Sequence, residues 1–304
     1  MKIGVVIVTF NRKKDLEKAL GIYEQQTFTP EYLIVINNNS TDGTTEFLSE
    51  WKEKSSNFKK YVVNLKQNIG GSGGFYTGLE KALDLDAEWI WVADDDAYPE
   101  IDVLEKINEF LENNKNKNIS AVCGAIINNG KVDISHRKRI KETFFEVDQV
   151  PVLENEYKSD FFKLDLFSYV GTVINKEKLI EVGLTEKDYF IYYDDTEHSY
   201  RLSKVGDIIC LPSARINHDV EFRKSVDIDW KGYYGTRNRM LFLKKHFSKR
   251  QYLYMYNKIY FKTIIKDVLR KKSLGNKQVK IALKDSKNNI KGMHLIYKPG
   301  WTCK

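Results

Sequence analysis

Three adjacent aspartates are the residues whose type and spacing point most directly to chemistry. Asp94, Asp95 and Asp96 follow the apolar run 89–93. Their like charges repel, so a hard divalent cation with oxygen ligands, such as Mg²⁺ or Mn²⁺, is expected to neutralise them, and such ions commonly also bind phosphate groups. A solvated acidic turn that caps a helix at 101–113 is the alternative that this triplet alone leaves open.

A second acidic cluster follows the aromatic run 189–193, for which a strand is predicted. Asp194, Asp195 and Glu197 lie close together in the sequence, and Arg201 comes four residues after Glu197. If one cluster holds a metal, a carboxylate of the other remains free to accept a proton as a general base. A helix cap with a Glu197–Arg201 ion pair is the alternative.

The segment 68–75 packs four glycines and a serine between a predicted strand, 61–65, and a predicted helix, 75–85. Bare backbone amides at the start of that helix can closely approach a negatively charged or sugar-bearing ligand. The segment lacks the Gly-Lys-Ser/Thr ending of a phosphate-binding P-loop. A tight loop that needs positive φ angles is the alternative.

The expected elements bring these segments together. Strands are predicted at 3–8, 32–36, 61–65, 89–93 and 121–127, helices at 14–26, 44–54, 75–85 and 101–113, and further strands at 167–174, 189–193 and 208–211. This alternation predicts an α/β fold with a mostly parallel sheet flanked by helices. Because ligands of such sheets bind beyond the carboxyl ends of the strands, the loops around Asn11, Asn38, Gly70 and Asp95 are expected to converge. His218 follows the strand 208–211 and could add a neutral imidazole to the metal ligands.

The composition indicates a folded protein. With 304 residues, 42% of them hydrophobic and 30% charged, the chain can build one large or two smaller domains. No apolar run is long enough for a signal peptide or a membrane-spanning helix, so a cytoplasmic protein is expected. The three cysteines, Cys123, Cys210 and Cys303, are widely scattered and indicate reduced thiols rather than a disulfide framework or a zinc site.

The net charge of +7 is concentrated in the carboxyl-terminal region, where 244–304 is crowded with lysine and arginine. A basic amphipathic helix is predicted at 252–272, with Ile264 and Ile265 among its lysines. Such a helix fits a membrane surface, and a helical subdomain with a solvated basic face is the equal alternative. No basic and aromatic module of known pattern occurs, so a nucleic-acid partner is not expected.

The order of the motifs resembles the family-two inverting glycosyltransferases, which have the GT-A fold, over roughly residues 1–245. The motifs that carry the resemblance are Val-Val-Ile-Val-Thr-Phe-Asn-Arg, Asn-Asn-Asn-Ser-Thr-Asp-Gly-Thr, Asn-Ile-Gly-Gly-Ser-Gly-Gly-Phe, Ala-Asp-Asp-Asp, Tyr-Asp-Asp-Thr-Glu and a later histidine. The glycine segment, the triple aspartate and the Asp-Asp-x-Glu pattern look most like the bacterial galactofuranosyltransferases, which use UDP-galactofuranose. Rhamnosyltransferases that use dTDP-rhamnose are also similar.

The resemblance implies a role for each matching residue. The nucleotide sugar would be bordered by Thr9, Asn11, Arg12, Asn37, Asn68, Gly70, Gly71, Gly73, Asp94 and Asp95. Asn37 takes the place where relatives generally have an aspartate facing the base, and its oxygen can still accept from a uracil or thymine N3–H. Asp94, Asp96 and His218 match the metal ligands, Mn²⁺ or Mg²⁺, and Asp195 matches the catalytic base. Beyond these matches, Asp194 and Glu197 could orient the acceptor or hold Arg201. The aromatic residues could offer faces for sugar stacking, although aromatic residues in strands more often pack in the core; they are Trp91, Tyr192, Tyr193 and Trp230.

The resemblance therefore implies a metal-assisted single displacement that inverts the configuration of the transferred sugar. The acceptor would be a hydroxyl group of a cell-surface glycan or a polyprenyl-linked glycan, on the inner face of the membrane if the basic region binds there. The expected domains are a catalytic GT-A domain at 1–220 and a helical basic region at 221–304.

Two other classes of protein compete with this interpretation. In a nucleotidyltransferase the glycine segment would follow the first strand and carry a basic residue, whereas here it follows the third strand. A non-catalytic sugar-binding module predicts the loss of one acidic cluster, and both clusters are present.

Overall fold

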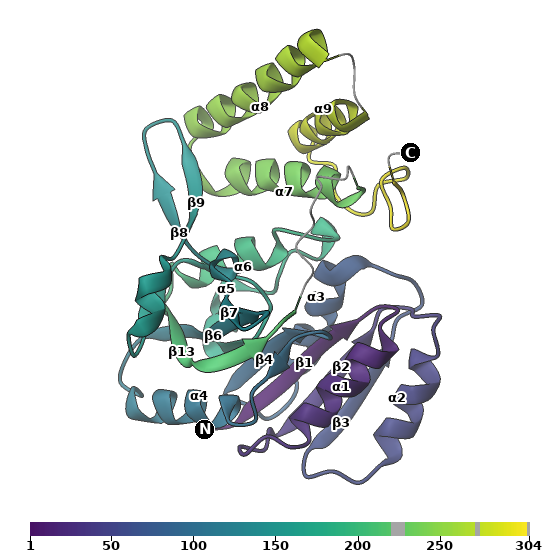
Figure 1. Ribbon diagram of the computed structural model, residues 1–304, viewed down its shortest axis with the longest axis vertical. Coiled ribbons are helices and arrows are strands. Elements are labelled where there is room, and N and C mark those ends of the chain that lie inside the picture. The colour runs from purple at the N-terminus through teal and green to yellow at the C-terminus, as the bar shows by residue number, and fades with distance from the viewer. Residues whose placement is uncertain (220–228, 271–273, 303–304) are drawn as a thin grey trace.

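A computed structural model describes residues 1–219, 229–270 and 274–302 (Figure 1). The first half alternates strand and helix: β1 Ile3–Thr9, α1 Lys13–Tyr23, β2 Tyr32–Asn37, α2 Thr44–Glu53, β3 Lys59–Asn64, α3 Gly70–Leu83, β4 Trp89–Asp94, β5 Tyr98–Pro99, α4 Val103–Asn113 and β6 Ile119–Asn128. The middle contains β7 Lys131–Val132, β8 Arg137–Glu142, β9 Val147–Pro151, β10 Phe162–Leu164, β11 Leu166–Phe167, β12 Thr172–Asn175, α5 Lys176–Val182, α6 Asp194–Leu202 and β13 Asp207–Asn217, with short 3-10 helices at Ile134–His136, Glu154–Lys158 and Lys187–Tyr189. The helices α7 Lys231–His246, α8 Lys249–Arg270 and α9 Leu274–Lys287 follow.

In the described residues, the main sheet runs in the order β10-β13-β6-β12-β4-β1-β2-β3, with β5 beside β13 and β7 beside β6. The strands β4, β1, β2 and β3 are parallel to one another, and β12 is antiparallel to both of its neighbours. A small separate sheet has the order β11-β8-β9. The α/β prediction with a mostly parallel sheet is confirmed.

Apolar side chains cover both faces of the sheet. Every residue of β1 and of β2 is buried, as expected for strands with a layer on each side. One core cluster includes Leu16 of α1, Leu48 of α2 and Ile107 of α4. The other includes Leu79 of α3 and Leu179 of α5. Helices therefore pack on both faces and leave the carboxyl ends of the strands open for a site.

The glycine segment was expected to be a loop, and this expectation is wrong, because α3 already begins at Gly70. The helix uses its glycines for close packing. A Cβ atom on Gly74 would lie 2.5 Å from Val8 Cγ1, and one on Gly78 would lie 2.3 Å from Val6 Cγ1. The missing side chains let α3 lie directly on β1.

The aromatic run before Asp194 is also not the predicted strand. A 3-10 helix ends at Tyr189, and Phe190, Tyr192 and Tyr193 then adopt positive φ angles. The predicted strand at 167–174 is divided into β11 and β12, while the one at 208–211 is longer than expected and forms β13. Because β13 continues to Asn217, His218 comes directly after its end.

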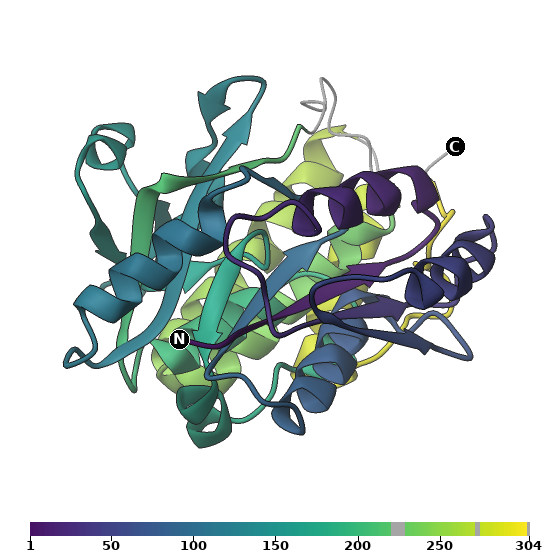
Figure 2. The ribbon, with the colours of Figure 1, turned by 90° about the horizontal axis from the view of Figure 1, so that it is seen from below.

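The carboxyl-terminal helices form a group at one end of the molecule (Figure 1), and Figure 2 shows them behind the sheet. The tip of the β8–β9 hairpin extends to α8 (Figure 1). The helical character predicted for this region is confirmed, although the proposed domain boundary at 220 and 221, the end of the predicted helix at Lys272, and Cys303 lie outside the described residues. None of the helices in the described ranges combines the length and the apolar character that crossing a membrane requires.

Candidate active site

A pocket of about 480 Å³ opens at the carboxyl ends of β1 and β4. Of the residues singled out from the sequence, its lining includes Thr9, Arg12, Asn68, Gly70, Gly71, Asp94, Asp95, Asp96, Asp194, Asp195 and His218. They come from the ends of three strands and the starts of two helices. The expected convergence of the loops thus occurs at the sheet edge where α/β proteins bind ligands.

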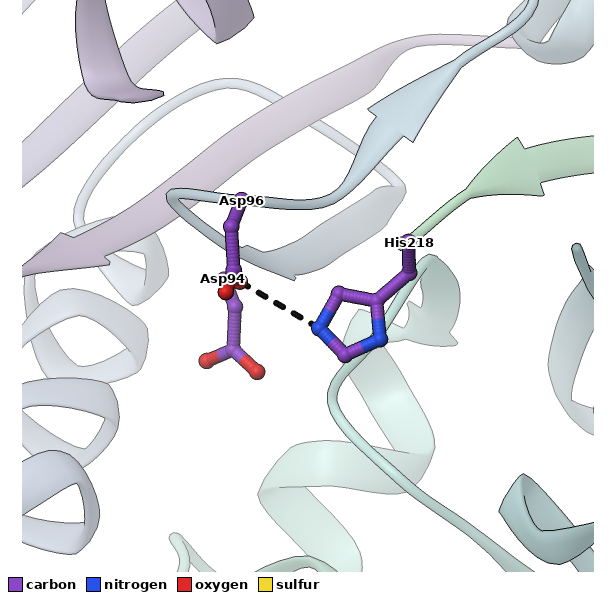
Figure 3. A group of neighbouring side chains, drawn as sticks. All are labelled: Asp94, Asp96 and His218. Atoms are coloured by element: carbon purple, nitrogen blue, oxygen red, sulfur yellow. Dashed lines mark ion pairs between the residues drawn. The ribbon is translucent and has the colours of Figure 1, made fainter. Parts of the chain in front are cut away.

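Asp94, Asp96 and His218 form a group that could hold a metal ion (Figure 3). One ligand atom of each lies within 4.8 Å of the others, and His218 Nε2 is 3.3 Å from Asp96 Oδ1. β4 delivers the two aspartates, and β13 delivers the histidine, whose backbone N–H donates to the carbonyl of Ile127. Two carboxylates and an imidazole suit Mn²⁺ or Mg²⁺, so the residues fit the expected metal.

The acidic triplet is held by a small set of polar contacts. The Arg12 guanidinium pairs with Asp96 and lies 3.5 Å from Asp95 Oδ1. The Thr9 hydroxyl donates to Asp95 Oδ2 over 2.6 Å. Burial raises the pKa of Asp95 to about 7, with a smaller contribution from the charge of Asp96.

Asp94 and Asp96 have opposite pKa shifts. Burial and then the charges of Asp96 and Asp95 raise the pKa of Asp94 well above its ordinary value. Burial acts in the same direction on Asp96, but the hydrogen bond to His218 and the charge of Arg12 outweigh it and lower that pKa to about 2. One arginine is thus shared among one buried and two half-buried carboxylates, and a cation beside Asp94 would relieve their repulsion.

Asp194 and Asp195 begin α6 on another wall of the pocket. Burial, followed by the charge of Asp195, raises the pKa of Asp194 to about 8. Burial also raises the pKa of Asp195, and it outweighs the opposite effect of the hydrogen bond that Asp195 accepts from the Thr196 backbone N–H. A carboxylate that is more basic than usual is better able to accept a proton.

Residues 4–182 match the family described as glycosyl transferase family 2. This chain belongs to that family. The assignment agrees with the fold and with the order of motifs along the sequence.

Individual relatives in the family are similar over different lengths. Galactofuranosyltransferase GlfT1 of Mycolicibacterium smegmatis is 35% identical over 97 residues, which are 32% of this chain and 30% of that protein. The dTDP-rhamnosyl transferase RfbF of Shigella flexneri is 26% identical over 257 residues, 80% of each chain. The solved structure of GalNAc-T7 with UDP, GalNAc and Mn²⁺ has a TM-score of 0.66 at 15% identity and covers 95% of this chain and 56% of its own. This last similarity confirms the GT-A fold.

Two acceptor-binding predictions for this family member are wrong. Trp91 is fully buried in the core, and its Nε1–H donates to the hydroxyl of Tyr23 over 2.7 Å. Glu197 is also fully buried and forms ion pairs with Arg201 and Lys245, each 2.8 Å long. The ion-pair alternative considered for Glu197 is therefore the one found.

The prediction that Asn37 faces the base is also corrected. Its Nδ2 donates to Asn64 Oδ1 over 2.8 Å and to Thr45 Oγ1 over 2.9 Å, and the residue is almost completely buried. The lining of the pocket contains its neighbour Asn38 instead. Asn37 thus occupies a hydrogen-bonded position between β2, β3 and α2.

Three further predicted contacts lie outside the lining of the pocket. Asn11 Oδ1 accepts from the Thr41 backbone N–H over 2.7 Å, so it holds two loops together. Gly73 is buried against Ile69. The Tyr193 ring packs on Phe242, with 6.0 Å between the ring centres.

Other lining residues were missed from the sequence. They include Tyr169, Phe190, Lys231, Pro299 and His136, whereas Tyr192 and Trp230, which also line the pocket, had been considered as faces for sugar stacking. The His136 ring lies 5.5 Å from that of His218 in an edge-to-face arrangement. Burial and the neighbouring Arg137 charge lower the pKa of His136 to about 3, so it is neutral beside the metal ligands. No local motif marks this residue.

Proposed function

We propose that this chain is an inverting, metal-dependent glycosyltransferase, with UDP-galactofuranose as the preferred donor. The sugar would move to a hydroxyl group of a cell-surface glycan or of a lipid-linked acceptor. One observation carries the proposal: the pocket that contains the Asp94, Asp96 and His218 group is also lined by Asp195. A metal-binding group and a separate carboxylate are the two parts that this reaction requires.

Each side chain has a role in this proposal. Mn²⁺ or Mg²⁺, held by Asp94, Asp96 and His218, would supply positive charge to the departing nucleoside diphosphate. The nucleotide sugar would be bordered by residues that line the pocket: Thr9, Arg12, Asn68, Gly70, Gly71 and Asp95. Asp195 takes the proton of the acceptor hydroxyl, which attacks the anomeric carbon from the face opposite to the leaving group. Burial raises the pKa of Asp194 to about 8, so this residue is largely protonated near neutral pH.

The relatives support two donors. The local similarity to galactofuranosyltransferase GlfT1 favours UDP-galactofuranose. RfbF, a dTDP-rhamnosyl transferase that matches 80% of this chain, makes dTDP-rhamnose the second candidate. Both donors would use the same metal group and the same base.

A membrane-facing surface supports a lipid-linked acceptor. On α8, Phe261, Ile265, Val268 and Leu269 are all exposed, and the last two are 78% and 76% exposed. An adjacent strip of the α8 surface carries three lysines spaced four residues apart, Lys258, Lys262 and Lys266. A basic edge therefore runs beside the apolar one. This combination is typical of a helix that lies in an anionic membrane surface.

The β8–β9 hairpin extends the same surface. At its tip Phe144 is 64% exposed, and the ring centre of Phe145 lies 5.4 Å from that of Tyr254 on α8. Contact of these two elements with the inner face of the cell membrane would place the enzyme in the cytoplasm beside a polyprenyl-linked acceptor.

The decisive measurement is the release of free nucleoside diphosphate from UDP- and dTDP-sugars, including UDP-galactofuranose and dTDP-rhamnose. The assay contains Mn²⁺ or EDTA, with a membrane glycolipid extract as the acceptor. We expect metal-dependent release from UDP-galactofuranose, and Asp195→Asn to lower it by roughly 100- to 10,000-fold because the general base is lost.

Asp188→Asn is the matched control, since Asp188 is an exposed carboxylate in the 3-10 helix Lys187–Tyr189, shortly before α6. This variant should retain wild-type release. If only dTDP-rhamnose is turned over, the proposed mechanism stands and the donor is dTDP-rhamnose. The absence of turnover and of metal-dependent nucleotide binding with every donor would contradict the proposal and favour a non-catalytic sugar-binding module.

A further inference from the structure

The segment just before Asp194 has an unusual backbone. Phe190, Tyr192 and Tyr193 have φ angles of 69°, 66° and 69°. The Ile191 N–H donates to the Tyr189 carbonyl over 2.9 Å, and Phe190 has a ψ of −58°, so the chain forms a γ-turn of the rare, strained type. Large non-glycine residues seldom adopt such angles unless their surroundings hold them there.

Asn238, on α7, provides part of that restraint. Its Nδ2 group donates to the carbonyls of Tyr189, Ile191 and Tyr192 over 3.0, 2.9 and 2.8 Å. The two hydrogens of one buried amide are thus shared among three carbonyls that the left-handed turns direct to the same point. In an ordinary strand the carbonyls alternate in direction and could not converge in this way.

Arg237 fixes the orientation of that amide. Its Nε donates to Asn238 Oδ1 over 2.9 Å. The Nδ2 hydrogens of Asn238 therefore point toward the carbonyls of the segment before Asp194. The guanidinium also donates to the carbonyls of Tyr189 and Gly292, over 2.9 and 2.7 Å. Arg237 and Asn238 are both fully buried, so water does not compete for these contacts.

The amino-terminal end of α3 holds the segment from the other side. The Ser72 N–H donates to the Phe190 carbonyl over 3.2 Å. A Cβ atom on Gly70 would lie 2.0 Å from the same oxygen, so this approach requires glycine. Phe190 is thereby fixed between the start of α3, which lines the pocket, and α7, whose Tyr234 ring centre lies 5.1 Å from that of Phe190.

We propose that Arg237 and Asn238 are positioning residues that hold segment 190–193 in its left-handed conformation and so aim Asp195 into the pocket. Neither side chain belongs to the lining of the pocket, whereas Phe190, Ile191 and Tyr192 do. α6 begins at Asp194, immediately after the segment, so its conformation sets the direction in which the Asp195 carboxylate points. The inference rests on the proposed role of Asp195 as the base.

The first test separates turnover from donor binding. Because a small displacement of a catalytic group strongly slows a reaction, Asn238→Ala and Arg237→Lys should lower kcat by roughly 10- to 100-fold. Their Kd for UDP, measured by calorimetry with Mn²⁺, should change less than about threefold, because the donor residues lie on other elements. Arg239→Lys, on the same helix, and Asn257→Ala, on the exposed side of α8, are the matched controls and should retain both values.

A rescue variant tests the conformational mechanism. Asparagine adopts the left-handed conformation more readily than tyrosine, so Tyr193→Asn should restore part of the kcat that Asn238→Ala loses. An unchanged kcat in folded Asn238→Ala, or a parallel loss of kcat and UDP affinity without any rescue, would overturn the proposal.

Hydrogen exchange provides a readout that does not require activity. Amides of 189–196 should exchange faster in Asn238→Ala and in Arg237→Lys than in the wild type and the two controls, with the sheet strands unchanged. If no donor is turned over but this exchange pattern appears, the positioning role stands and the proposed reaction fails. If turnover is found and exchange in 189–196 is unaffected, the positioning role is wrong.

Discussion

At the scale of single residues, Asp94 and Asp96 show how neighbouring groups determine charge. Both are largely buried, but Asp96 faces Arg12 and His218 whereas Asp94 faces mainly the other carboxylates. The pKa values of the two groups therefore shift in opposite directions, although only one residue separates them. A cation placed between them would bring both to the ionised form.

His198 offers a test of burial without involving the metal ligands. It is fully buried on α6, with Nδ1 2.5 Å from the Tyr169 hydroxyl. Burial and the charge of Arg201 lower its pKa from 6.5 to about 3. Between these values the unfolded chain binds a proton that the folded chain does not, so acidification destabilises the fold.

We expect His198→Asn to weaken the pH dependence of stability. From pH 6.5 to pH 5, the free energy of unfolding of the wild type should fall by about 2 kcal/mol more than that of the variant, at ~1.4 kcal/mol per pH unit. Urea unfolding at both pH values measures this difference. Equal slopes for the two proteins would mean that His198 is protonated in the folded state.

At the scale of elements, the contact between α3 and β1 depends on glycine. A Cβ on Gly78 would lie 2.3 Å from Val6 Cγ1 and 3.2 Å from Ile36 Cγ1, whereas one on Gly21, in α1, would meet no atom within 4 Å. We expect Gly78→Ala to lower the free energy of unfolding by about 1–3 kcal/mol because of overpacking. Gly21→Ala should raise it by about 0.5–1 kcal/mol because alanine favours the helix.

Urea unfolding of the two glycine variants gives the comparison directly. Gly78 and Gly21 are both helical and neither lines the pocket, so donor binding does not complicate the result. Similar stabilities for Gly78→Ala and Gly21→Ala would contradict the close packing of α3 on β1.

The strands and helices of the first half could be predicted from the sequence because their signals are local. The buried run in β1 and the helical spacing of Leu16 and Leu20 are visible in short windows. The helical start at Gly70 could not be predicted in this way, because it depends on contacts with β1 and with the distant Phe190. Local propensity favours a loop there, and tertiary packing overrides it.

The candidate site was predictable to a similar extent. Asp94, Asp96 and His218 were grouped correctly from their places after strands. The aromatic run 189–193 has strand-forming residues, but its backbone is set by Asn238, which lies 49 residues from Tyr189. Partners so far apart leave no periodic signal in one sequence, and the role of Trp91, which donates to Tyr23, was misjudged for the same reason.

At the scale of the whole molecule, the exposed surface of α8 and the β8–β9 tip predicts binding to anionic membranes. We expect the wild type to sediment with vesicles of phosphatidylglycerol and phosphatidylcholine, and less with phosphatidylcholine alone. The double variant Ile265→Glu, Leu269→Glu should bind at least about tenfold more weakly, because two apolar side chains are lost and two negative charges are added.

Leu295→Glu is the control for this prediction, since Leu295 is 90% exposed but belongs to neither α8 nor the hairpin. It should bind vesicles like the wild type. If the double variant retains vesicle binding, the surface is not a membrane contact. If it instead abolishes a dimer seen by analytical ultracentrifugation, a second copy of the chain covers the surface.

The wide separation of the lining residues along the chain affects when the pocket comes into existence. Val8 and Pro299 both belong to it, and β13 brings His218 to two aspartates made much earlier in translation. The parallel strands β4, β1, β2 and β3 can pair as soon as they leave the ribosome, but at that stage they carry only part of the metal group. A growing chain therefore lacks part of the pocket lining, so a ligand of this pocket can stabilise only chains that have extended as far as Pro299. Such stabilisation would distinguish chains that include Pro299 from shorter ones.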